Sequence, residues 1–167
     1  HYRSALDLVV IGSMQEHSID MEWLQNEVFA DPAIKENLAQ IDVKGPYDVV
    51  SLFLAGDKDL RNYIGKADIN TDERPILEFS LPKNLYMDVN GIDRVHELLA
   101  TATEIVPPVQ MQGEPKDFYL NVGKSYNQYS FRLTQALSAF EKVLELDPSD
   151  KEAARYAESI RKELESR

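Results

Sequence analysis

Cysteine is absent from the 167-residue sequence, and with it disulfide bonds, thiolate zinc sites and cysteine nucleophiles. Histidine is scarce: His1, His17 and His96 stand alone, without the His-x-His or His-x3-His spacing of a transition-metal site. No apolar run approaches the roughly 20 residues of a membrane-spanning helix, and no signal peptide opens the chain. We therefore expect no metal, no cofactor and a cytoplasmic location, with a membrane anchor left open for a larger parent protein.

Clusters of lysine and arginine are also missing. The formal net charge is −11 at pH 7, and the sequence pI is about 4.7. Because binding to phosphate backbones and to anionic membranes depends on clustered basic residues, neither nucleic acid nor a membrane surface is an expected partner. The charge is uneven, with a net −10 over residues 1–129 and −1 over residues 130–167. Solubility explains the acidity, and the two parts present different kinds of surface.

Two apolar segments in the first half of the chain predict β-strands. Leu8 to Ile11 form a continuous apolar run, which is typical of strands covered on both faces of an α/β sheet. Residues 76–81 form the second predicted strand. We expect the strands near 7–12 and 76–81 to pair antiparallel beneath covering helices. The early position of the first strand indicates a truncated sheet.

Caps and apolar spacing predict helices between and after these strands. Asp20 can cap a helix at about 20–30, and Asp31-Pro32 is a strong start signal for the next helix. Further helices are expected from Tyr47 to Ala55 (with a strand as the alternative), from Asp57 to Ile64 before Gly65, and after Asn90-Gly91. The faces expected to be buried are Trp23, Leu24 and Val28; Ile34, Leu38 and Ile41; and Ile92, Val95, Leu99 and Ala102.

After a linker, the chain is predicted to be helical to its end. Pro-Pro at 107–108 and Gly-Glu-Pro at 113–115 bracket this linker. The last helix has an outer face of opposite charges at i,i+4 spacing, which suits a capping helix. The apolar stripes of the three helices are Tyr119, Val122 and Tyr126; Leu133, Leu137, Phe140 and Leu144; and Ala153, Ala157, Ile160 and Leu164.

The first two of these helices carry residues at the spacing of a helical repeat. Ala136, Phe140 and Pro148 resemble helix B of a tetratricopeptide repeat (TPR) and its exit. The helix A pattern is matched one residue out of register, as if the turn were one residue longer. The matching residues of helix A are Tyr119, Val122, Gly123 and Tyr126.

The TPR resemblance implies close helix packing and a role in protein contacts. Gly123 and Ala136 mark the places where the paired helices approach closely. One repeat with a cap is shorter than the roughly three repeats that a stable stack needs. We therefore expect the hairpin to pack on the rest of the chain or on another copy. The alternative is a partner peptide that contacts Lys124, Asn127 and Gln128.

Two stretches of the first half also resemble a known family. They read Asp-Leu-Val-Val-Ile-Gly-Ser at 7–13 and Asp-Ile-Asn-Thr-Asp-Glu-Arg-Pro-Ile-Leu-Glu-Phe-Ser-Leu-Pro at 68–82. They resemble the sixth strand and the closing loop and strand of a spermidine synthase (polyamine aminopropyltransferase) of the membrane-fused type. The resemblance implies the end of a Rossmann-like, methyltransferase-type domain. Its donor-binding and catalytic elements would precede His1, so we expect no catalytic residue here.

The polar loop within the second stretch holds the candidate substrate-wall residues. Asn70, Asp72 and Glu78 could offer oxygens to a polyamine ammonium in an intact parent enzyme. Arg74 could instead pair with Asp72 or Glu78 and lock the loop, which then closes the sheet edge and shapes the wall of the site. The loop is therefore expected either to contact the substrate or to close the sheet edge.

Together these patterns predict an α+β chain in three parts: residues 1–106 as the end of a spermidine synthase-like domain, 107–115 as a linker, and 116–167 as a TPR-like hairpin with its cap. The expected function is that of a non-catalytic C-terminal module of a transferase, used for assembly or protein contact. The alternatives are a self-sufficient enzyme or small-molecule binder and a free-standing interaction domain. Expected partners are the rest of the parent protein, another copy in a homo-oligomer, or a protein bound by the helices.

Overall fold

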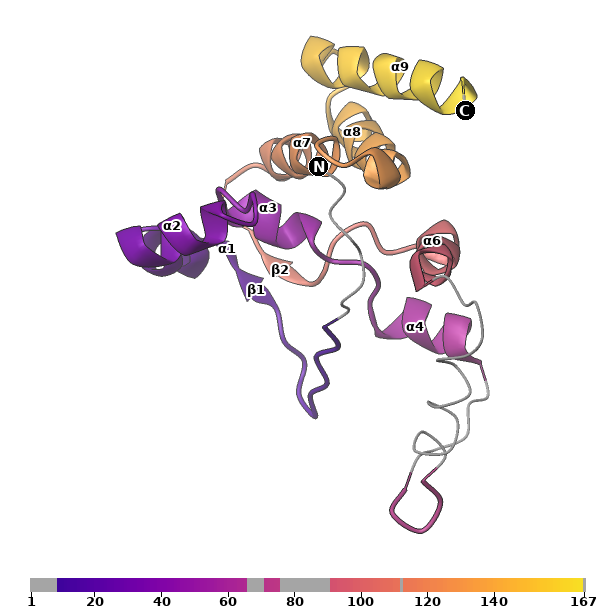
Figure 1. Cartoon of the computed structure of the whole chain (residues 1–167). Helices are drawn as coiled ribbons and strands as arrows, with labels where there is room; N and C mark the ends of the chain where they lie inside the picture. The colour runs from indigo at the N-terminus through magenta and orange to yellow at the C-terminus, as the bar shows by residue number, and fades with distance from the viewer. Residues whose placement is uncertain (1–8, 66–70, 76–90, 112, 167) are drawn as a thin grey trace. The chain divides into compact units, whose positions relative to one another are not determined.

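The computed structural model describes residues 9–65, 71–75, 91–111 and 113–166 (Figure 1). The described residues are mostly helical with one small two-stranded sheet, which agrees with the α+β expectation. Contacts divide the chain into two units: a helical unit of residues 13–54 and 104–167, and a small unit of residues 1–12 and 55–103. This grouping differs from a division at residues 107–115, because residues 13–54 pack with the C-terminal helices.

The sheet pairs two strands that the sequence did not single out. Strand β1 (Ile19–Asp20) lies parallel to β2 (Val109–Gln110), with Ile19 opposite Val109. The amide of Ile19 donates to the carbonyl of Pro108 at 2.8 Å. The predicted antiparallel pairing is therefore wrong, and β2 lies inside the segment expected to be a linker. Strand β1 leads directly into α1, and β2 leads toward α7 (Figure 1).

The apolar run near the start of the chain is also not the buried strand that its composition predicted. Residues 9–12 belong to no strand, and the other predicted strand, 76–81, lies outside the described residues. Val9, Val10 and Ile11 are 85%, 79% and 87% exposed. A β-branched run favours extended backbone, but a strand becomes buried only where neighbouring strands and helices cover it. The described residues supply no such cover here.

The first helical segment begins where its cap predicted but changes its pitch. The carboxylate of Asp20 accepts from the amides of Glu22 and Trp23 at 2.9 and 3.0 Å, at the start of α1 (Met21–Trp23). A π-helix, η1 (Leu24–Val28), follows, in which the Phe29 amide bonds to the Leu24 carbonyl. Leu24 is buried while its neighbour Trp23 is 56% exposed, because successive residues of a helix point roughly 100° apart around the axis. The expected burial of Trp23 is wrong.

Helix α2 (Pro32–Ala39) begins as predicted but does not bury its apolar face. Asp31 caps it by accepting from the amides of Ala33 and Ile34 at 2.8 and 3.3 Å. None of the eight residues of α2, all of them described, is buried. Ile34 is 40% exposed and Ile41, just after the helix, 54% exposed, so the predicted burial is wrong at both positions. The amphipathic pattern gives the helix an apolar face without supplying a surface to cover it.

The segment after α2 forms the helix expected there, though a shorter one. Helix α3 (Pro46–Ser51) ends well before Ala55, and it packs against α7. Val50 is fully buried. The C-cap residue Leu52 is half exposed, so the apolar run to Ala55 is not buried throughout.

The small unit has two described helices, α4 (Asp57–Ile64) and α6 (Gly91–Thr101), which contact each other. Gly65, with φ of 61°, ends α4 as predicted, because this left-handed conformation favours glycine. The buried carboxylate of Asp59 accepts from the amide and the hydroxyl of Thr103 at 2.9 and 2.8 Å. The buried apolar residues of α6 are Val95, Leu98 and Leu99.

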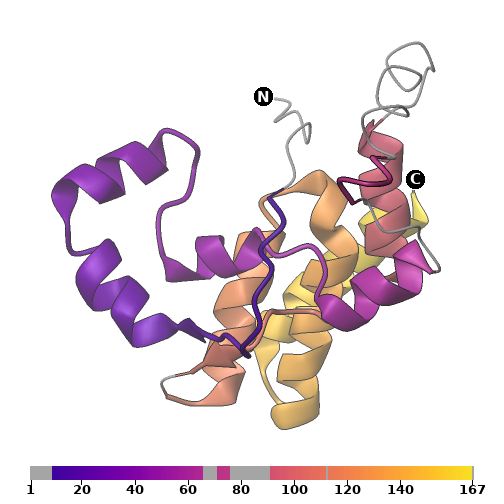
Figure 2. The ribbon, with the colours of Figure 1, turned by 90° about the horizontal axis from the view of Figure 1, so that it is seen from below.

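Three long helices build the C-terminal part of the helical unit: α7 (Pro115–Tyr126), α8 (Leu133–Leu146) and α9 (Lys151–Glu165), with a 3-10 turn, η2 (Ser130–Arg132), before α8. They lie side by side, with α8 contacting both neighbours (Figure 2). A Cβ atom on Gly123 would lie 2.9 Å from Cε1 of Phe140, and Ala136 is fully buried. The predicted close approach of α7 and α8 is confirmed at Gly123, and its occurrence at Ala136 stays a prediction.

Candidate functional site

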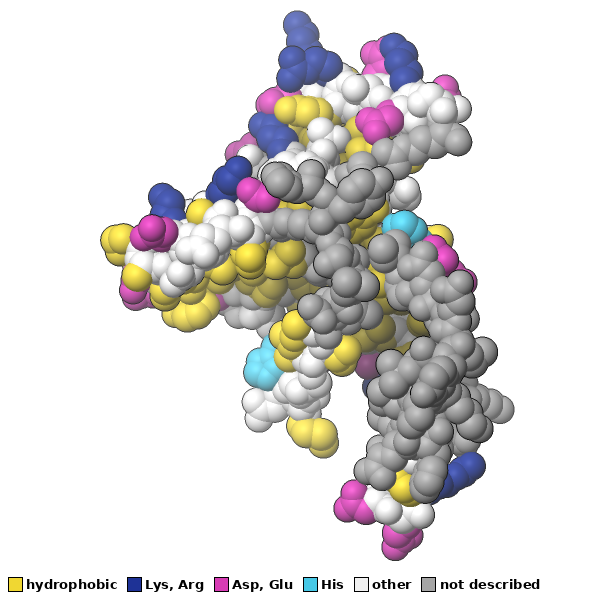
Figure 3. All heavy atoms as spheres, viewed as in Figure 1, with side chains coloured by type: hydrophobic (Ala, Val, Ile, Leu, Met, Phe, Trp, Pro, Cys, Tyr) yellow, Lys and Arg dark blue, Asp and Glu magenta, His cyan; other side chains and the backbone are white. Residues whose placement is uncertain are grey.

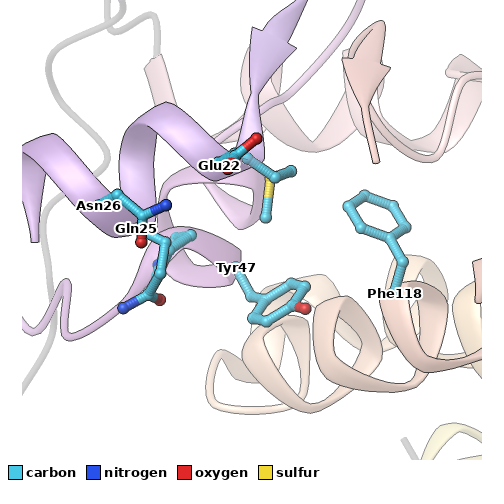
Figure 4. Close-up of a pocket in the computed structure, with 7 residues that line it drawn as sticks. Glu22, Gln25, Asn26, Tyr47 and Phe118 are labelled. Atoms are coloured by element: carbon cyan, nitrogen blue, oxygen red, sulfur yellow. The ribbon is translucent and has the colours of Figure 1, made fainter. Parts of the chain in front are cut away.

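A small cavity opens within the helical unit between α1, η1, α3 and α7. Its volume is about 140 Å3. Figure 4 shows the rings of Tyr47 and Phe118 on one side, with Gln25 and Asn26 of η1 on the other. The lining residues are Met21, Glu22, Gln25, Asn26, Pro46, Tyr47 and Phe118.

The cavity has an apolar base and a polar rim. Met21 and Phe118 are buried, and the rings of Tyr47 and Phe118 lie 6.0 Å apart with planes inclined by 58°. Glu22, Gln25 and Asn26 are exposed at the rim. Aromatic faces and a thioether accept either an apolar group or the stem of a long cationic side chain. The carboxylate of Glu22 is the one charged group among the seven lining residues.

Asp48 holds the α3 wall of this cavity in place. One carboxylate oxygen of Asp48 accepts from the amides of Lys44 and Gly45 at 2.8 and 3.1 Å. The other accepts from the hydroxyl of Ser125 at 2.7 Å and the side-chain amide of Gln128 at 3.2 Å. The side chain is 7% exposed, so these bonds replace the water that Asp48 loses. They tie the start of α3 to the end of α7 and so place Tyr47 opposite Phe118.

Arg132, in η2 after α7, forms a second link to the segment that follows α3. Its buried guanidinium donates to the carbonyl of Phe53 and lies 4.7 Å from the centre of the Tyr126 ring. The hydroxyl of Tyr126 donates to the carbonyl of Ile105 at 2.6 Å. Burial lowers the pKa of Arg132 and raises the pKa of Tyr126. This buried cluster therefore has a structural role: it stabilises the packing of α7 and η2 against the segment after α3.

The three residues predicted as partner contacts lie at the end of α7 and partly serve the fold. Lys124 forms an ion pair with Glu152 of α9, with 3.0 Å between Nζ and Oε1. Gln128 donates to Asp48, and Asn127 is the C-cap residue of α7. A contact of these side chains with a partner stays a prediction.

The predicted substrate-wall loop is described only in part. Asp72 and Arg74 are exposed, and the backbones of Thr71 and Arg74 exchange hydrogen bonds of 3.2 and 3.0 Å. Asn70 and Glu78 lie outside the described residues. The described part is a tight turn at 71–74, and the role of the loop toward a substrate stays a prediction.

Sequence reasoning missed the cavity because its walls come from three separate segments. Tyr47 and Phe118 are 71 positions apart in the sequence. Neither the π-helical turn nor the Asp48 bonds leave a periodic signal. The one usable clue was Pro46 at the start of a helix, which fixes where Tyr47 emerges.

Within the described ranges, no group of three or more His, Asp or Glu residues could hold a metal ion. None of the helices described is long and apolar enough to cross a membrane.

Comparison with models of protein families, with curated proteins and with solved structures finds no match for this chain. The resemblances to TPR helices and to spermidine synthases therefore stay predictions, and the case for a function depends on the geometry of the helical unit.

Proposed function

We propose that this chain is a protein-contact module without catalytic activity of its own, and that its parent protein is a spermidine synthase-like transferase. In this proposal α7 and α8 are a TPR-like hairpin with α9 as its cap. The hairpin packs on α3 of the same chain, so contacts with other proteins fall mainly to the neighbouring segment, residues 21–42. This segment, which comprises α1, η1, α2 and the turn after α2, is called the arm.

One observation carries the proposal: the arm leaves large apolar side chains in water. Trp23, Ile34 and Ile41 are all more than a third exposed, and hydrophobic side chains gather along the arm in the space-filling view (Figure 3). Moving a large apolar side chain from full exposure to full burial stabilises by about 1.5–3 kcal/mol, so covering these partly exposed side chains is worth roughly half of that each. A helical segment with a tryptophan and two isoleucines exposed is typical of a surface that a protein partner covers.

The composition of the cavity also favours contact over catalysis. General acid–base catalysis most often uses histidine, and nucleophilic catalysis needs a nucleophile with a base within hydrogen-bond reach. Here Glu22 and the phenol of Tyr47 are the titratable side chains among the seven lining residues. The arrangement suits recognition of a side chain by shape and charge.

A peptide library displayed on phage tests the proposal. Peptides selected on the intact chain are expected to lose binding when Trp23→Ala or Ile34→Ala is introduced. They should retain binding to Ile64→Ala, which truncates an equally exposed side chain of the small unit. Failure to enrich any peptide, or binding that ignores both arm substitutions, contradicts the proposal.

The cavity itself supports a second candidate function, that of a small-molecule binder. Calorimetric titration with methylthioadenosine and separately with putrescine distinguishes the two functions. The contact proposal expects neither to bind. Saturable binding that Tyr47→Ala abolishes would favour the small-molecule function.

Self-association remains part of the proposal because Val9, Val10 and Ile11 form a second exposed apolar run. An exposed run of β-branched residues can pair with the same run of another chain as added strands. Sedimentation velocity is expected to show a homo-oligomer that Val10→Lys dissociates. A monodisperse monomer at all concentrations would contradict this part.

A further inference from the structure

The arm concentrates negative charge beside its exposed apolar side chains. Residues 21–42 contain five acidic residues and one basic residue, Lys35. Glu22, Glu27 and Glu36 are exposed carboxylates on α1, η1 and α2. A partner that covers this arm must therefore approach several carboxylates as well as Trp23 and Ile34.

The C-terminal helices show the opposite arrangement of charge. Residues 116–167 contain nine acidic and nine basic residues. Many of them pair within the unit, as Lys116 does with Asp147 at 3.0 Å and Arg161 with Glu141 at 2.7 Å. A charged partner would have to replace these pairs, whereas on the arm it would meet the exposed carboxylates of Glu22, Glu27 and Glu36. Electrostatic complementarity therefore directs a basic partner to the arm.

The cavity lies at the base of the arm and adds a specific place for one cationic side chain. Of the described residues, seven line it and none is basic. Its apolar base of Met21, Tyr47 and Phe118 fits the methylene stem of lysine or arginine. Glu22 at the rim fits the charged end, and an aromatic ring face attracts a cation further.

We propose that the arm binds a basic amphipathic segment of a partner protein, with one lysine or arginine side chain in the cavity between Tyr47, Phe118 and Glu22. This inference rests on the proposed function, since it assigns chemistry to the partner of the same surface. The apolar face of the segment covers Trp23, Ile34 and Ile41, and its basic residues face the carboxylates of the arm. A second copy of this chain fits less well, because two arms would bring like charges together.

Synthetic peptides of defined pattern test the inference on the full chain. The first probe is a helical peptide of about four turns with leucine on one face and lysine on the other. The second keeps the leucines and replaces lysine by glutamate, and the third spaces the lysines with glycine and serine. Calorimetry gives the affinities. Because Trp23 is the only tryptophan, its emission reports binding at the arm without background.

We expect the leucine–lysine peptide to bind at least about tenfold more tightly than either other peptide. Trp23→Ala should weaken its binding about tenfold or more, as expected for an aromatic anchor. Glu22→Gln should weaken it more than Glu36→Gln, since Glu36 is an arm carboxylate that does not line the cavity. Glu73→Gln in the small unit is the matched control and should leave the affinity unchanged. Circular dichroism confirms that each variant folds.

Several outcomes overturn the inference. Equal affinity for the leucine–glutamate peptide removes the role of charge but leaves the contact proposal standing. Equal affinity for the lysine–glycine–serine peptide removes the role of the apolar face. Absence of binding by the leucine–lysine peptide, or binding unchanged by Trp23→Ala, shows that a basic amphipathic segment is not the partner of the arm. Equal effects of Glu22→Gln and Glu36→Gln remove the cavity from the proposal.

Discussion

The arm and the C-terminal helices are both helical and belong to one unit, yet they use their apolar residues in opposite ways. Helices α7, α8 and α9 bury theirs against one another, and Val122, Phe140 and Val143 are fully buried. The arm buries Leu24 but exposes Trp23 and Ile34. An amphipathic pattern therefore predicts a helix in both regions, but burial follows only where a second surface is present. Where the described residues of the unit supply no such surface, a partner protein is the proposed cover.

The largest loss of stability is expected at the centre of the packed helices α7, α8 and α9. Phe140→Ala should lower the free energy of unfolding by about 3–5 kcal/mol, because it opens a cavity in a fully buried core. The same change removes the ring that packs on Gly123 and stacks on Tyr156 at 4.8 Å. Urea unfolding measures the loss. The control is Leu146→Ala at the half-exposed end of α8, and an equal loss there would contradict the closed packing of these helices.

Adding one methyl group to the contact of α7 with α8 comes next. Gly123→Ala places a Cβ about 2.9 Å from the Phe140 ring, so the ring or the helix must move. We expect a loss of about 1–3 kcal/mol, as for overpacked cores, measured by thermal or urea unfolding. If Gly123→Ala instead stabilises the chain through helix propensity, the two helices are farther apart than described.

The hydrogen bonds of Asp48 between α3 and α7 are the next test, because they hold the α3 wall of the cavity against the C-terminal helices. Asp48→Ala leaves the amides of Lys44 and Gly45 and the hydroxyl of Ser125 without their acceptor and should cost about 2 kcal/mol. Ser125→Ala removes one donor and should cost less, about 1 kcal/mol. A double-mutant cycle is expected to show coupling between the two positions. Strictly additive losses would contradict the bond.

The buried phenol of Tyr126 in α7 should make the stability of the fold depend on pH in the alkaline range. Its pKa is raised above the ordinary value mainly by burial, so folding favours the protonated form. The stabilisation from the buried, protonated phenol is therefore complete below about pH 10, the ordinary pKa of tyrosine. It is lost as the pH rises toward and through the higher pKa of the folded state. The stability of the chain should therefore fall above about pH 10 by more than that of Tyr126→Phe. Parallel pH profiles of the two proteins would rule out this assignment.

The smallest effect on stability is expected in the arm. Ile34→Ser changes a side chain that remains 40% exposed, so the loss should stay within about 0.5 kcal/mol. Binding of the leucine–lysine peptide should nevertheless weaken. A large loss of stability without peptide present would mean that the chain itself covers this face of α2.

Local signals predicted much of the helical architecture because they act over a few residues. Asp20, Asp31 with Pro32, and Gly65 begin or end helices as expected, since each satisfies backbone groups next to it. The close approach at Gly123 was also predicted, because only a small residue admits a neighbouring helix.

Longer-range features were not predictable in the same way. The pairing of Ile19 with Val109 joins residues 90 positions apart and has no spacing to reveal it. The exposure of Trp23 depends on which distant segments pack against the arm, and the cavity depends on the bonds of Asp48 across to α7. The apolar run at residues 9–11 had the right composition for a covered strand, but composition does not supply the cover.

Fluorescence of Trp23 tests the central claim most directly, because this residue is the only tryptophan and lies on the arm. In the free chain we predict emission near that of tryptophan in water and ready quenching by acrylamide. Addition of the leucine–lysine peptide should shift the emission to shorter wavelengths and protect the indole from acrylamide. Emission of a buried indole in the free chain, or no response to the peptide, would contradict an open contact surface for a basic partner.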